Sequence, residues 1–243
     1  MPPGRWIMAA HRVSQQFRAP DTRPMPALLF DLDGTLLNSD TIHEEVFREL
    51  WAARGLDMPA GFYMQHVHGR LNTDIFAEFL PDEPDPQGLS DAKEAAFRAR
   101  LPCPYPAMPG SAELMRRAKS KGWPMAVVTN AMRLNAKAML RATGLDSYID
   151  TIVIGEECSK AKPDPEPYLE AMRQLLVQAP DCIAFEDSPA GLKSARASGA
   201  FCVGLRSSLD DAALIAAGAQ ATINDFNDPA LEAILAHIQG VGA

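Results

Sequence analysis

The sequence predicts an α/β fold in which a doubly wound parallel sheet carries a small helical domain inserted after its first strand. The first observation is that short apolar runs alternate with segments of helical periodicity from about residue 26 onward. The second is an interval of about ninety residues between the first two runs, where a strand-to-strand crossover needs only about a dozen. The extra length predicts a separate group of elements within that interval.

Each apolar run has the length and the turn-rich flanks of a buried strand. The predicted strands cover residues 28–31, 125–129, 152–154, 182–186, 201–205 and 221–223. Helices are expected between them, because Ser111 is a suitable N-cap and Gly122 a suitable stop. Two further helices, 132–143 and 190–198, end before Gly144 and Gly199. This order of strand and helix is the one that a doubly wound sheet requires.

The long interval contains helical patterns and no convincing strand. Its predicted helices cover 43–54, 73–80 and 91–101, the last with Ser90 as its N-cap. A proline-rich stretch over 102–106 closes the interval. We therefore expect a helical domain over 39–106 and a core domain made of 26–38 and 107–243.

The first 25 residues differ from the rest of the chain and show no helical or strand period. They hold one acidic residue, Asp21, against four arginines, Arg5, Arg12, Arg18 and Arg23. A transit peptide has this kind of composition. We interpret the segment instead in one of two ways. Either it is a disordered extension, or translation really begins at Met8 or Met25 and the residues before that start are not made. In both cases we exclude it from the fold.

Composition excludes several classes of function. With 243 residues, 47% of them hydrophobic, the chain can bury a full core. A net charge of −8 argues against a nucleic-acid partner, and no apolar run approaches the roughly 18 residues of a membrane span. The four cysteines show no CxxC spacing and are expected to be reduced core thiols: Cys103, Cys158, Cys182 and Cys202. We expect a cytoplasmic monomer.

The first apolar run ends in two carboxylates, Asp31 and Asp33, followed by Gly34 and Thr35. Open α/β sheets bind their ligands at the carboxyl ends of strands. The pattern Asp-x-Asp-Gly-Thr should occur by chance in roughly one chain of this length in a few hundred. The end of the first strand is therefore the first candidate for a functional site.

Three later motifs follow in order. An apolar strand ends in Thr129 and Asn130, Lys162 precedes a proline-punctuated helix start, and another strand ends in the paired acids Glu186 and Asp187. With the Asp-x-Asp-Gly-Thr motif, this series resembles the haloacid dehalogenase superfamily, in particular its helical-capped phosphatases and its members similar to β-phosphoglucomutase. The resemblance runs from about residue 27 to the end of the chain. It implies a Rossmann-like core and a helical cap over the active site.

The resemblance also implies catalytic roles for the motif residues. Asp31 would be the nucleophile that forms an aspartyl-phosphate, and Asp33 the general acid that becomes a general base. Two like charges about 4 Å apart repel by roughly 4 kcal/mol at an effective dielectric constant of 20, so a carboxylate that approaches a phosphate needs countercharge. Lys162 would supply part of it, and Thr129 would donate a hydrogen bond to the phosphoryl group.

A metal cofactor would supply the rest of the countercharge. The resemblance implies Mg²⁺, which prefers hard oxygen ligands. Its ligands would be Asp31, Asp187 and the backbone carbonyl of Asp33, with Glu186 orienting metal-bound water.

The helical segment offers candidates for substrate binding. His43 resembles a histidine of β-phosphoglucomutase and of related sugar phosphatases, and Gly69 and Arg70 resemble a cap loop that approaches the active site. Asn130 joins them as a candidate. Asn72 stands where the mutase has an arginine for a second phosphate, which weakens a mutase interpretation. Lys93 is expected on a solvated helix face.

These observations predict a Mg²⁺-dependent phosphatase of a small phosphorylated metabolite, a sugar or polyol phosphate. One alternative is a mutase similar to β-phosphoglucomutase that uses the same aspartyl-phosphate. Another is a non-enzymatic module that binds Mg²⁺ or a phosphometabolite. Asp33 argues against the module, because binding alone does not need an acid–base residue.

Overall fold

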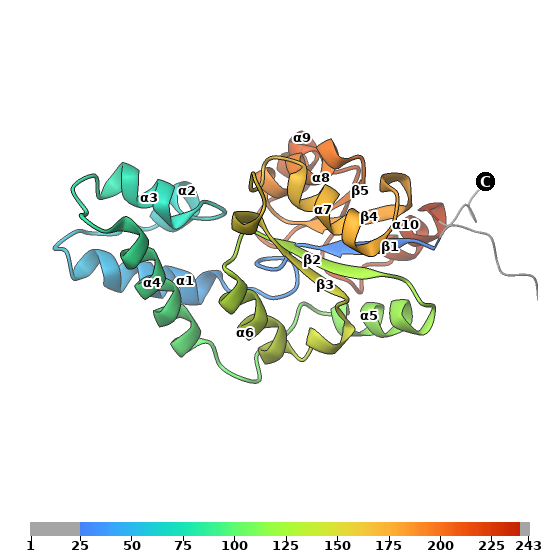
Figure 1. Ribbon diagram of the computed structural model, residues 1–243, viewed down its shortest axis with the longest axis horizontal. Coiled ribbons are helices and arrows are strands. Elements are labelled where there is room, and N and C mark those ends of the chain that lie inside the picture. Colours follow the sequence, from blue (N-terminus) through green and yellow to red (C-terminus); the bar gives the residue numbers. More distant parts are fainter. Residues whose placement is uncertain (1–24, 239–243) are drawn as a thin grey trace, which may run out of the picture.

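The computed structural model describes residues 25–238, and the extension predicted over 1–25 lies outside them except for Met25. Six strands form one parallel sheet in the order β3-β2-β1-β4-β5-β6, which confirms the predicted α/β architecture (Figure 1). The strands are β1 (Ala27–Phe30), β2 (Met125–Thr129), β3 (Thr151–Ile154), β4 (Cys182–Glu186), β5 (Phe201–Leu205) and β6 (Ala221–Ile223). All six were predicted, and four have the predicted bounds.

The strand order reverses at β1, which pairs with β2 on one side and with β4 on the other. Phe30 lies opposite Val127 of β2 and opposite Phe185 of β4. The carboxyl ends of β1, β2 and β4 therefore lie next to one another. In an open parallel sheet this switch in strand order is where ligands bind.

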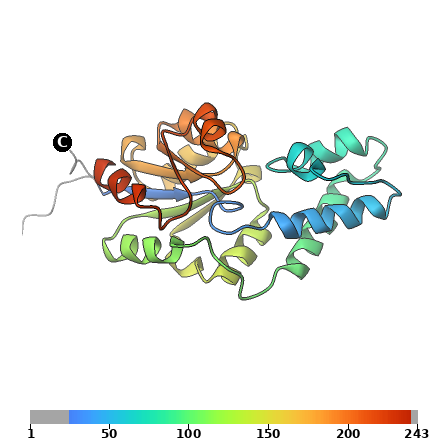
Figure 2. The ribbon, with the colours of Figure 1, turned by 180° about the vertical axis from the view of Figure 1, so that it is seen from behind.

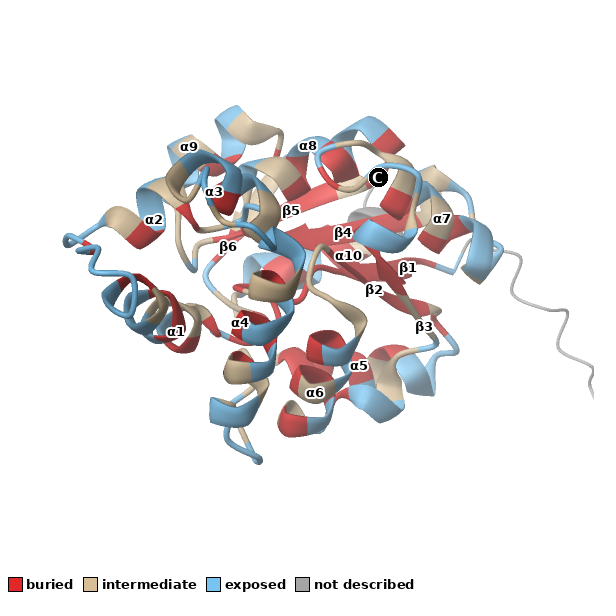
Figure 3. Cartoon of the chain, turned by 60° about the vertical axis from the view of Figure 1, so that its left-hand side comes forward, coloured by how far each residue is buried: buried red, intermediate tan, exposed pale blue. Residues whose placement is uncertain are grey.

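Helices cover both faces of the sheet and close two hydrophobic layers (Figures 1 and 3). Leu28 and Phe30 of β1 face one layer, and Ala27 and Leu29 face the other, as the two-residue period of a strand requires. The first layer packs on α5 (Ser111–Ser120), α6 (Arg133–Thr143) and α10 (Ala230–Ile238). The second packs on α7 (Glu166–Leu175), α8 (Pro189–Ser198) and α9 (Asp211–Ala217). Short 3₁₀ turns cover Asp146–Tyr148, Gly155–Glu157 and Ala179–Asp181.

Four helices form a separate group at the carboxyl end of β1 (Figures 1 and 2). They are α1 (Asp40–Ala52), α2 (Phe62–His66), α3 (Asn72–Phe79) and α4 (Pro86–Arg100). Phe47, Trp51 and Phe76 are buried in a hydrophobic cluster of their own between these helices. The described residues of this segment include no strand. We keep 39–106 as the proposed bounds of the helical domain.

Two predicted helix caps are wrong, and one short helix was missed. Ser90 is not an N-cap but lies inside α4, whose N-cap is Asp85, because the Asp85 carboxylate accepts a hydrogen bond from the Gly88 amide at 2.9 Å. Ser111 is the first residue of α5 rather than its cap, and Gly110 precedes it. The short helix α2 was not predicted, because five residues are too few to show a period.

The cysteines only partly match the prediction that all four are core thiols. Cys182 and Cys202 are buried in strands, Cys158 is half-buried, and Cys103 is exposed. The proline-rich stretch that contains Cys103 lies at the surface, which explains the difference. No helix among residues 25–238 is long and apolar enough to cross a bilayer.

The end of α7 yields a prediction on stability. Leu176 has φ of 58°, a left-handed conformation that costs a non-glycine residue about 1–2 kcal/mol, and its side chain is 91% exposed. Glycine relieves this strain. It also gives the unfolded chain more conformational entropy, which lowers the free energy of unfolding by about 0.4–1 kcal/mol and offsets part of the gain. We expect Leu176→Gly to raise the free energy of unfolding, measured by urea denaturation, by about 0.5–1 kcal/mol. Leu169→Gly, inside α7, should lower it by about 1 kcal/mol. A loss of stability in Leu176→Gly would contradict the strain argument.

Candidate active site

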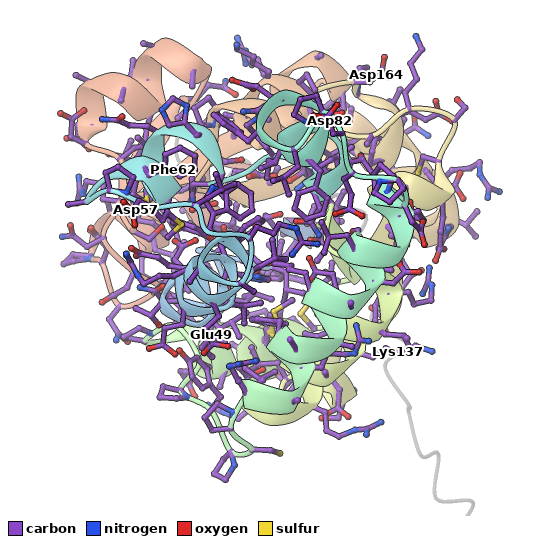
Figure 4. All side chains as sticks on the ribbon, turned by 90° about the vertical axis from the view of Figure 1, so that its left-hand side faces the viewer. Glu49, Asp57, Phe62, Asp82, Lys137 and Asp164 are labelled. Atoms are coloured by element: carbon purple, nitrogen blue, oxygen red, sulfur yellow. The ribbon has the colours of Figure 1, made fainter. Side chains whose placement is uncertain are left out.

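A cleft of about 140 Å³ lies between the carboxyl ends of the strands and the group α1–α4. Figure 4 views the molecule from the side of the helical group, so that the helices that carry Glu49 and Phe62 lie in front of the sheet. Nine of the ten predicted site residues line the cleft: Asp31, Asp33, His43, Gly69, Arg70, Thr129, Asn130, Lys162 and Asp187. The tenth, Glu186, is fully buried beneath them. Residues that are up to 156 positions apart in the chain thus meet at one place.

Lys162 forms the centre of the site. Its Nζ donates hydrogen bonds to Asp31 Oδ1 at 2.7 Å, to Glu186 Oε1 at 2.6 Å and to the Val128 carbonyl at 2.7 Å. Burial on its own would lower the pKa of Lys162, but Asp31 and Glu186 raise it above its ordinary value. Lys162 is therefore a fixed positive charge against Asp31.

Asn130 holds this lysine from the backbone side. Its Oδ1 accepts a hydrogen bond from the Lys162 amide at 3.2 Å, and its Nδ2 donates one to the Lys162 carbonyl at 3.3 Å. Gly155 makes room for the pair, because a Cβ at this position would lie 2.2 Å from Asn130 Oδ1. The amide lines the cleft, yet its polar atoms already serve to position Lys162.

Glu186 supports the lysine from below the cleft. Its Oε1 accepts hydrogen bonds from Lys162 Nζ and from the Tyr168 hydroxyl, the latter at 2.6 Å. A Cβ at Gly191 would lie 1.9 Å from Glu186 Oε2, so only glycine fits at this position of α8. Tyr168 was not predicted, since a buried tyrosine within a helix looks like any other core residue in the sequence.

Three buried carboxylates lie close enough together to hold a cation. Asp31, Glu186 and Asp187 each offer an oxygen within 4.8 Å of the others. Burial is the main reason that the pKa of Asp31 lies well above its usual range, while Lys162 opposes the shift. Burial and Glu186 raise the pKa of Asp187 to about 7. Three buried carboxylates with one lysine between them fit the hard-oxygen donor set of Mg²⁺, which would offset their charge.

Gly34 shapes the loop that follows β1. Its φ is 75°, and a Cβ would lie 2.0 Å from Asp187 Oδ2. Its backbone amide donates to the Leu37 carbonyl at 2.8 Å, which closes the turn. Glycine is therefore required twice, for the left-handed backbone and for the close approach of Asp187.

Asp33 lies beside this turn and is less buried than Asp31. Its Oδ1 accepts a short hydrogen bond from the Ser39 hydroxyl and lies 3.6 Å from His43 Nε2. Thr129 faces the same space from the end of β2, and its Oγ1 accepts a hydrogen bond from the Ala131 amide at 3.0 Å. A hydroxyl can accept and donate at once, so the Thr129 proton remains free for another partner.

Lys93 contradicts its predicted place on a solvated face. It is 4% exposed, lines the cleft, and donates to Glu94 Oε1 at 2.7 Å. Its Nζ also lies 2.8 Å from His43 Nδ1, and the His43 ring stacks on Phe97 at 3.9 Å. The charged composition of α4 suggested a solvated helix, but the contact with α1 buries this part of it.

Glu94 joins α4 to two other elements. Its carboxylate accepts hydrogen bonds from Asn72 at 2.6 Å and, over a shorter distance, from Asn135 of α6. Arg98 donates to Asn135 Oδ1 at 2.6 Å. A buried polar network therefore connects the helical group to the core, although no pattern along the chain indicated these partners.

His68 is a second residue that sequence reasoning missed. Its Nδ1 lies 3.0 Å from Asp40 Oδ1, which also accepts from the Tyr63 hydroxyl at 2.8 Å. The hydrogen bond to Asp40 raises the pKa of His68, against an opposing effect of burial. Its Nε2 lies 3.9 Å from Asp187 Oδ2, lines the cleft, and has no hydrogen-bond partner among the described residues. His66 does not line the cleft, and its ring packs on Phe62 and Phe79 instead. The sequence alone does not distinguish the two histidines.

The predicted loop of Gly69 and Arg70 reaches the core. A Cβ at Gly69 would lie 3.9 Å from the Ser188 Cβ at the start of α8. The Arg70 guanidinium is paired with Glu78 at 2.8 Å and donates to the His66 carbonyl at 2.9 Å. Arg70 thus borders the cleft with its charge already partnered.

Comparisons with known proteins find relatives that share most of this chain. A family model described as haloacid dehalogenase-like hydrolase matches residues 28–205. Protein CbbY of Rhodobacter capsulatus is 33% identical over 187 residues, which cover 72% of this chain and 82% of that protein. Validoxylamine A 7'-phosphate phosphatase of Streptomyces hygroscopicus subsp. limoneus is 33% identical over 189 residues, covering 76% and 88%. The structure of CbbY from Rhodobacter sphaeroides in complex with xylulose-(1,5)bisphosphate is 28% identical, with a TM-score of 0.73 and coverage of 83% and 95%.

The contact between Gly34 and Asp187 can be tested directly. We expect Gly34→Ala to weaken Mg²⁺ binding by at least about tenfold in isothermal titration calorimetry, because the new methyl group would displace the Asp187 carboxylate, a predicted Mg²⁺ ligand. Gly122→Ala is the matched control, since Gly122 has φ of 71° and nothing within 4 Å of a Cβ. Circular dichroism would verify that both variants fold. Equal Mg²⁺ affinities in the two variants would show that Asp187 is not held at the metal by this turn.

Proposed function

Since the chain belongs to the haloacid dehalogenase-like hydrolase family and is a phosphatase of that family, we propose that it hydrolyses a small phosphorylated metabolite, a sugar or polyol phosphate, with Mg²⁺. The observation that carries the proposal is the meeting of Asp31, Lys162 and Asp187 at the switch in strand order, with Asp33 beside them. The named phosphatase relative supports a phosphorylated metabolite as substrate.

Asp31 is the proposed nucleophile. One of its oxygens is fixed by Lys162 at 2.7 Å, which orients the carboxylate toward the cleft. Attack on phosphorus forms a bond from the Asp31 carboxylate and breaks the bond from phosphorus to the leaving oxygen, leaving an aspartyl-phosphate. The Thr129 hydroxyl, whose proton is free, is the proposed hydrogen-bond donor to a phosphoryl oxygen. All three N–H groups of Lys162 are used within the protein, so Lys162 would contribute its charge.

Asp33 is the proposed proton carrier. In the first step it gives its proton to the leaving alkoxide, and in the second it takes a proton from the water that attacks the aspartyl-phosphate. This second attack releases inorganic phosphate and restores Asp31. The Ser39 hydroxyl and His43 hold the Asp33 carboxylate on the side of the cleft that faces α1.

Mg²⁺ would be held by Asp31, Asp187 and the Asp33 carbonyl, with Glu186 at its edge, and would add the positive charge that a phosphate dianion needs near three carboxylates. Lys162 already binds one oxygen of Asp31 and one oxygen of Glu186. Asp187 is therefore the one of these three carboxylates that forms no hydrogen bond with Lys162.

The helical group is the proposed cap. Its residues His43, Gly69 and Arg70 and the core residue Asn130 border the cleft and are the proposed contacts to the substrate. A cap of this kind excludes water from the reacting groups. We further propose that the protein acts as a cytoplasmic monomer.

A phosphosugar mutase would need a cation for a second phosphate. Asn72, at the position that resembles the mutase arginine, is hydrogen-bonded to Ser90 and Glu94 and carries no charge. A non-enzymatic module would have no use for Asp33 positioned at the open side of the cleft. Hydrolysis is the reaction that the site supports best.

The nucleophile assignment gives the main test. We expect purified protein to hydrolyse p-nitrophenyl phosphate only with Mg²⁺, and Asp31→Asn to abolish the activity, because an amide is not a competent nucleophile toward phosphorus. Asp164→Asn, a loop carboxylate outside the cleft, is the control for folding and for contaminating phosphatases. Retention of most of the activity in Asp31→Asn would exclude Asp31 as the nucleophile.

The two steps assigned to Asp33 can be separated by the leaving group. For an alkyl phosphate, Asp33→Asn should lose about 10²–10⁴ in kcat, because the leaving oxygen needs a proton. With an aryl phosphate, phosphorylation of Asp31 should survive better while the attack of water stays slow, so that aspartyl-phosphate accumulates. Mass spectrometry after acid quench detects the added phosphoryl group. Equal losses on both substrates with no trapped intermediate would assign Asp33 to structure or metal placement instead.

A further inference from the structure

One wall of the cleft leads away from the reacting carboxylates. From Asp33 the polar contacts run through His43 to Lys93 and then to Glu94. Glu94 accepts hydrogen bonds from Asn72 and Asn135, and Asn72 also donates to Ser90. Glu156, in the Gly155–Glu157 turn, lines the same cleft and lies near enough to Glu94 for their charges to interact. We call these five residues the far wall: Asn72, Ser90, Glu94, Asn135 and Glu156.

The donors of the far wall are largely used within the protein. Asn72 Nδ2 donates to Ser90 and Glu94, and Asn135 donates to Glu94. Asn72 Oδ1 and the Glu156 carboxylate accept no hydrogen bond from the described residues. The far wall therefore offers mainly acceptors, which bind groups that carry N–H or O–H.

The far wall also has no spare positive charge among the described residues. Lys93 is neutralised by Glu94 at 2.7 Å, and Arg70 by Glu78 at 2.8 Å. Glu156 forms no ion pair there. Partial burial in the cleft and the neighbouring carboxylates of Glu94, Asp91 and Glu157 raise the pKa of Glu156.

We infer that the far wall selects a phosphomonoester whose remote end donates hydrogen bonds, with an ammonium group preferred over a hydroxyl, and that it rejects a second phosphate. Glu156 is the specificity-determining residue, because its carboxylate lines the cleft without a cation. A second phosphate has only acceptor oxygens and two negative charges. Beside Glu156 and Glu94 it would find, among the described residues, neither a free hydrogen-bond donor nor an unpaired cation. The inference rests on the proposed phosphatase function and names the substrate class of the same site.

Rhodobacter sphaeroides CbbY provides a contrast within the same fold. That relative is described with xylulose-(1,5)bisphosphate, so a protein of this fold accommodates a second phosphate. Here Asn72 is uncharged and Glu156 is anionic at the far wall. The expected rejection of a bisphosphate is therefore a property of this chain rather than of the fold.

Matched alkyl phosphates test the inference even while the natural substrate is unidentified. We would compare kcat/KM for phosphates of two to six carbons that end in an ammonium, a hydroxyl or a second phosphate group, with p-nitrophenyl phosphate as the reference. At the best chain length the ammonium compound should exceed the hydroxyl compound by about tenfold, as expected for a hydrogen bond to a charged group, and the bisphosphate should be the poorest.

Two variants assign the selectivity to a residue. Glu156→Gln should reduce the ratio of ammonium to hydroxyl compound to about one and should improve the bisphosphate relative to both. Glu157→Gln is the matched control, because Glu157 lies in the same turn but pairs with Arg133 outside the cleft, and it should keep the original ratios.

The outcomes separate the two proposals. No Mg²⁺-dependent hydrolysis of p-nitrophenyl phosphate would overturn the proposed function itself. Hydrolysis of p-nitrophenyl phosphate together with a bisphosphate as good as the hydroxyl compound would overturn only the inference. Unchanged ratios in Glu156→Gln would overturn the role of that residue.

Discussion

The site depends on one buried ammonium group placed between two carboxylates. Lys162 joins Asp31, after β1, to Glu186, at the end of β4, and it also binds the end of β2 through the Val128 carbonyl. Removing one partner of such a buried pair typically costs about 3–5 kcal/mol, because the other charge stays buried without compensation. The same contact therefore stabilises the sheet edge and orients the proposed nucleophile. Tyr168 and Gly191 serve this contact from beneath the cleft, and Asn130 positions the lysine while it also borders the cleft.

The charge of the site is uneven, and this constrains its chemistry. Carboxylates outnumber the cation at the end of the sheet, which favours a metal ion and then a phosphate. The proposed cap contributes Lys93 and His68, but each is already paired with a carboxylate, Glu94 and Asp40 respectively. A bound Mg²⁺ would therefore add positive charge where phosphoryl transfer is proposed, whereas the far wall has acceptors to spare. This gradient along one cleft is the physical basis for selecting one phosphate and no second.

The network around Glu94 links substrate selection to the position of the cap. Glu94 of α4 contacts Asn72 in the cap and Asn135 in the core, so a change at this carboxylate alters both the wall of the cleft and the contact between the two parts. Glu156 belongs to the core alone and is exposed, which makes it the better position at which to probe selectivity. Catalysis and selection consequently use different elements that meet in the same cleft.

The sequence by itself determined the α/β fold, six strands and the four motifs at strand ends, because these depend on local periodicity and on side-chain chemistry close along the chain. It also located the carboxylates and the lysine of the site. Only the tertiary structure decided that Lys93 is buried, that His68 faces Asp187 while His66 does not, and that Glu94 bridges cap and core. These facts depend on which helix faces pack together and on contacts between residues far apart in the chain, and no local pattern encodes such contacts.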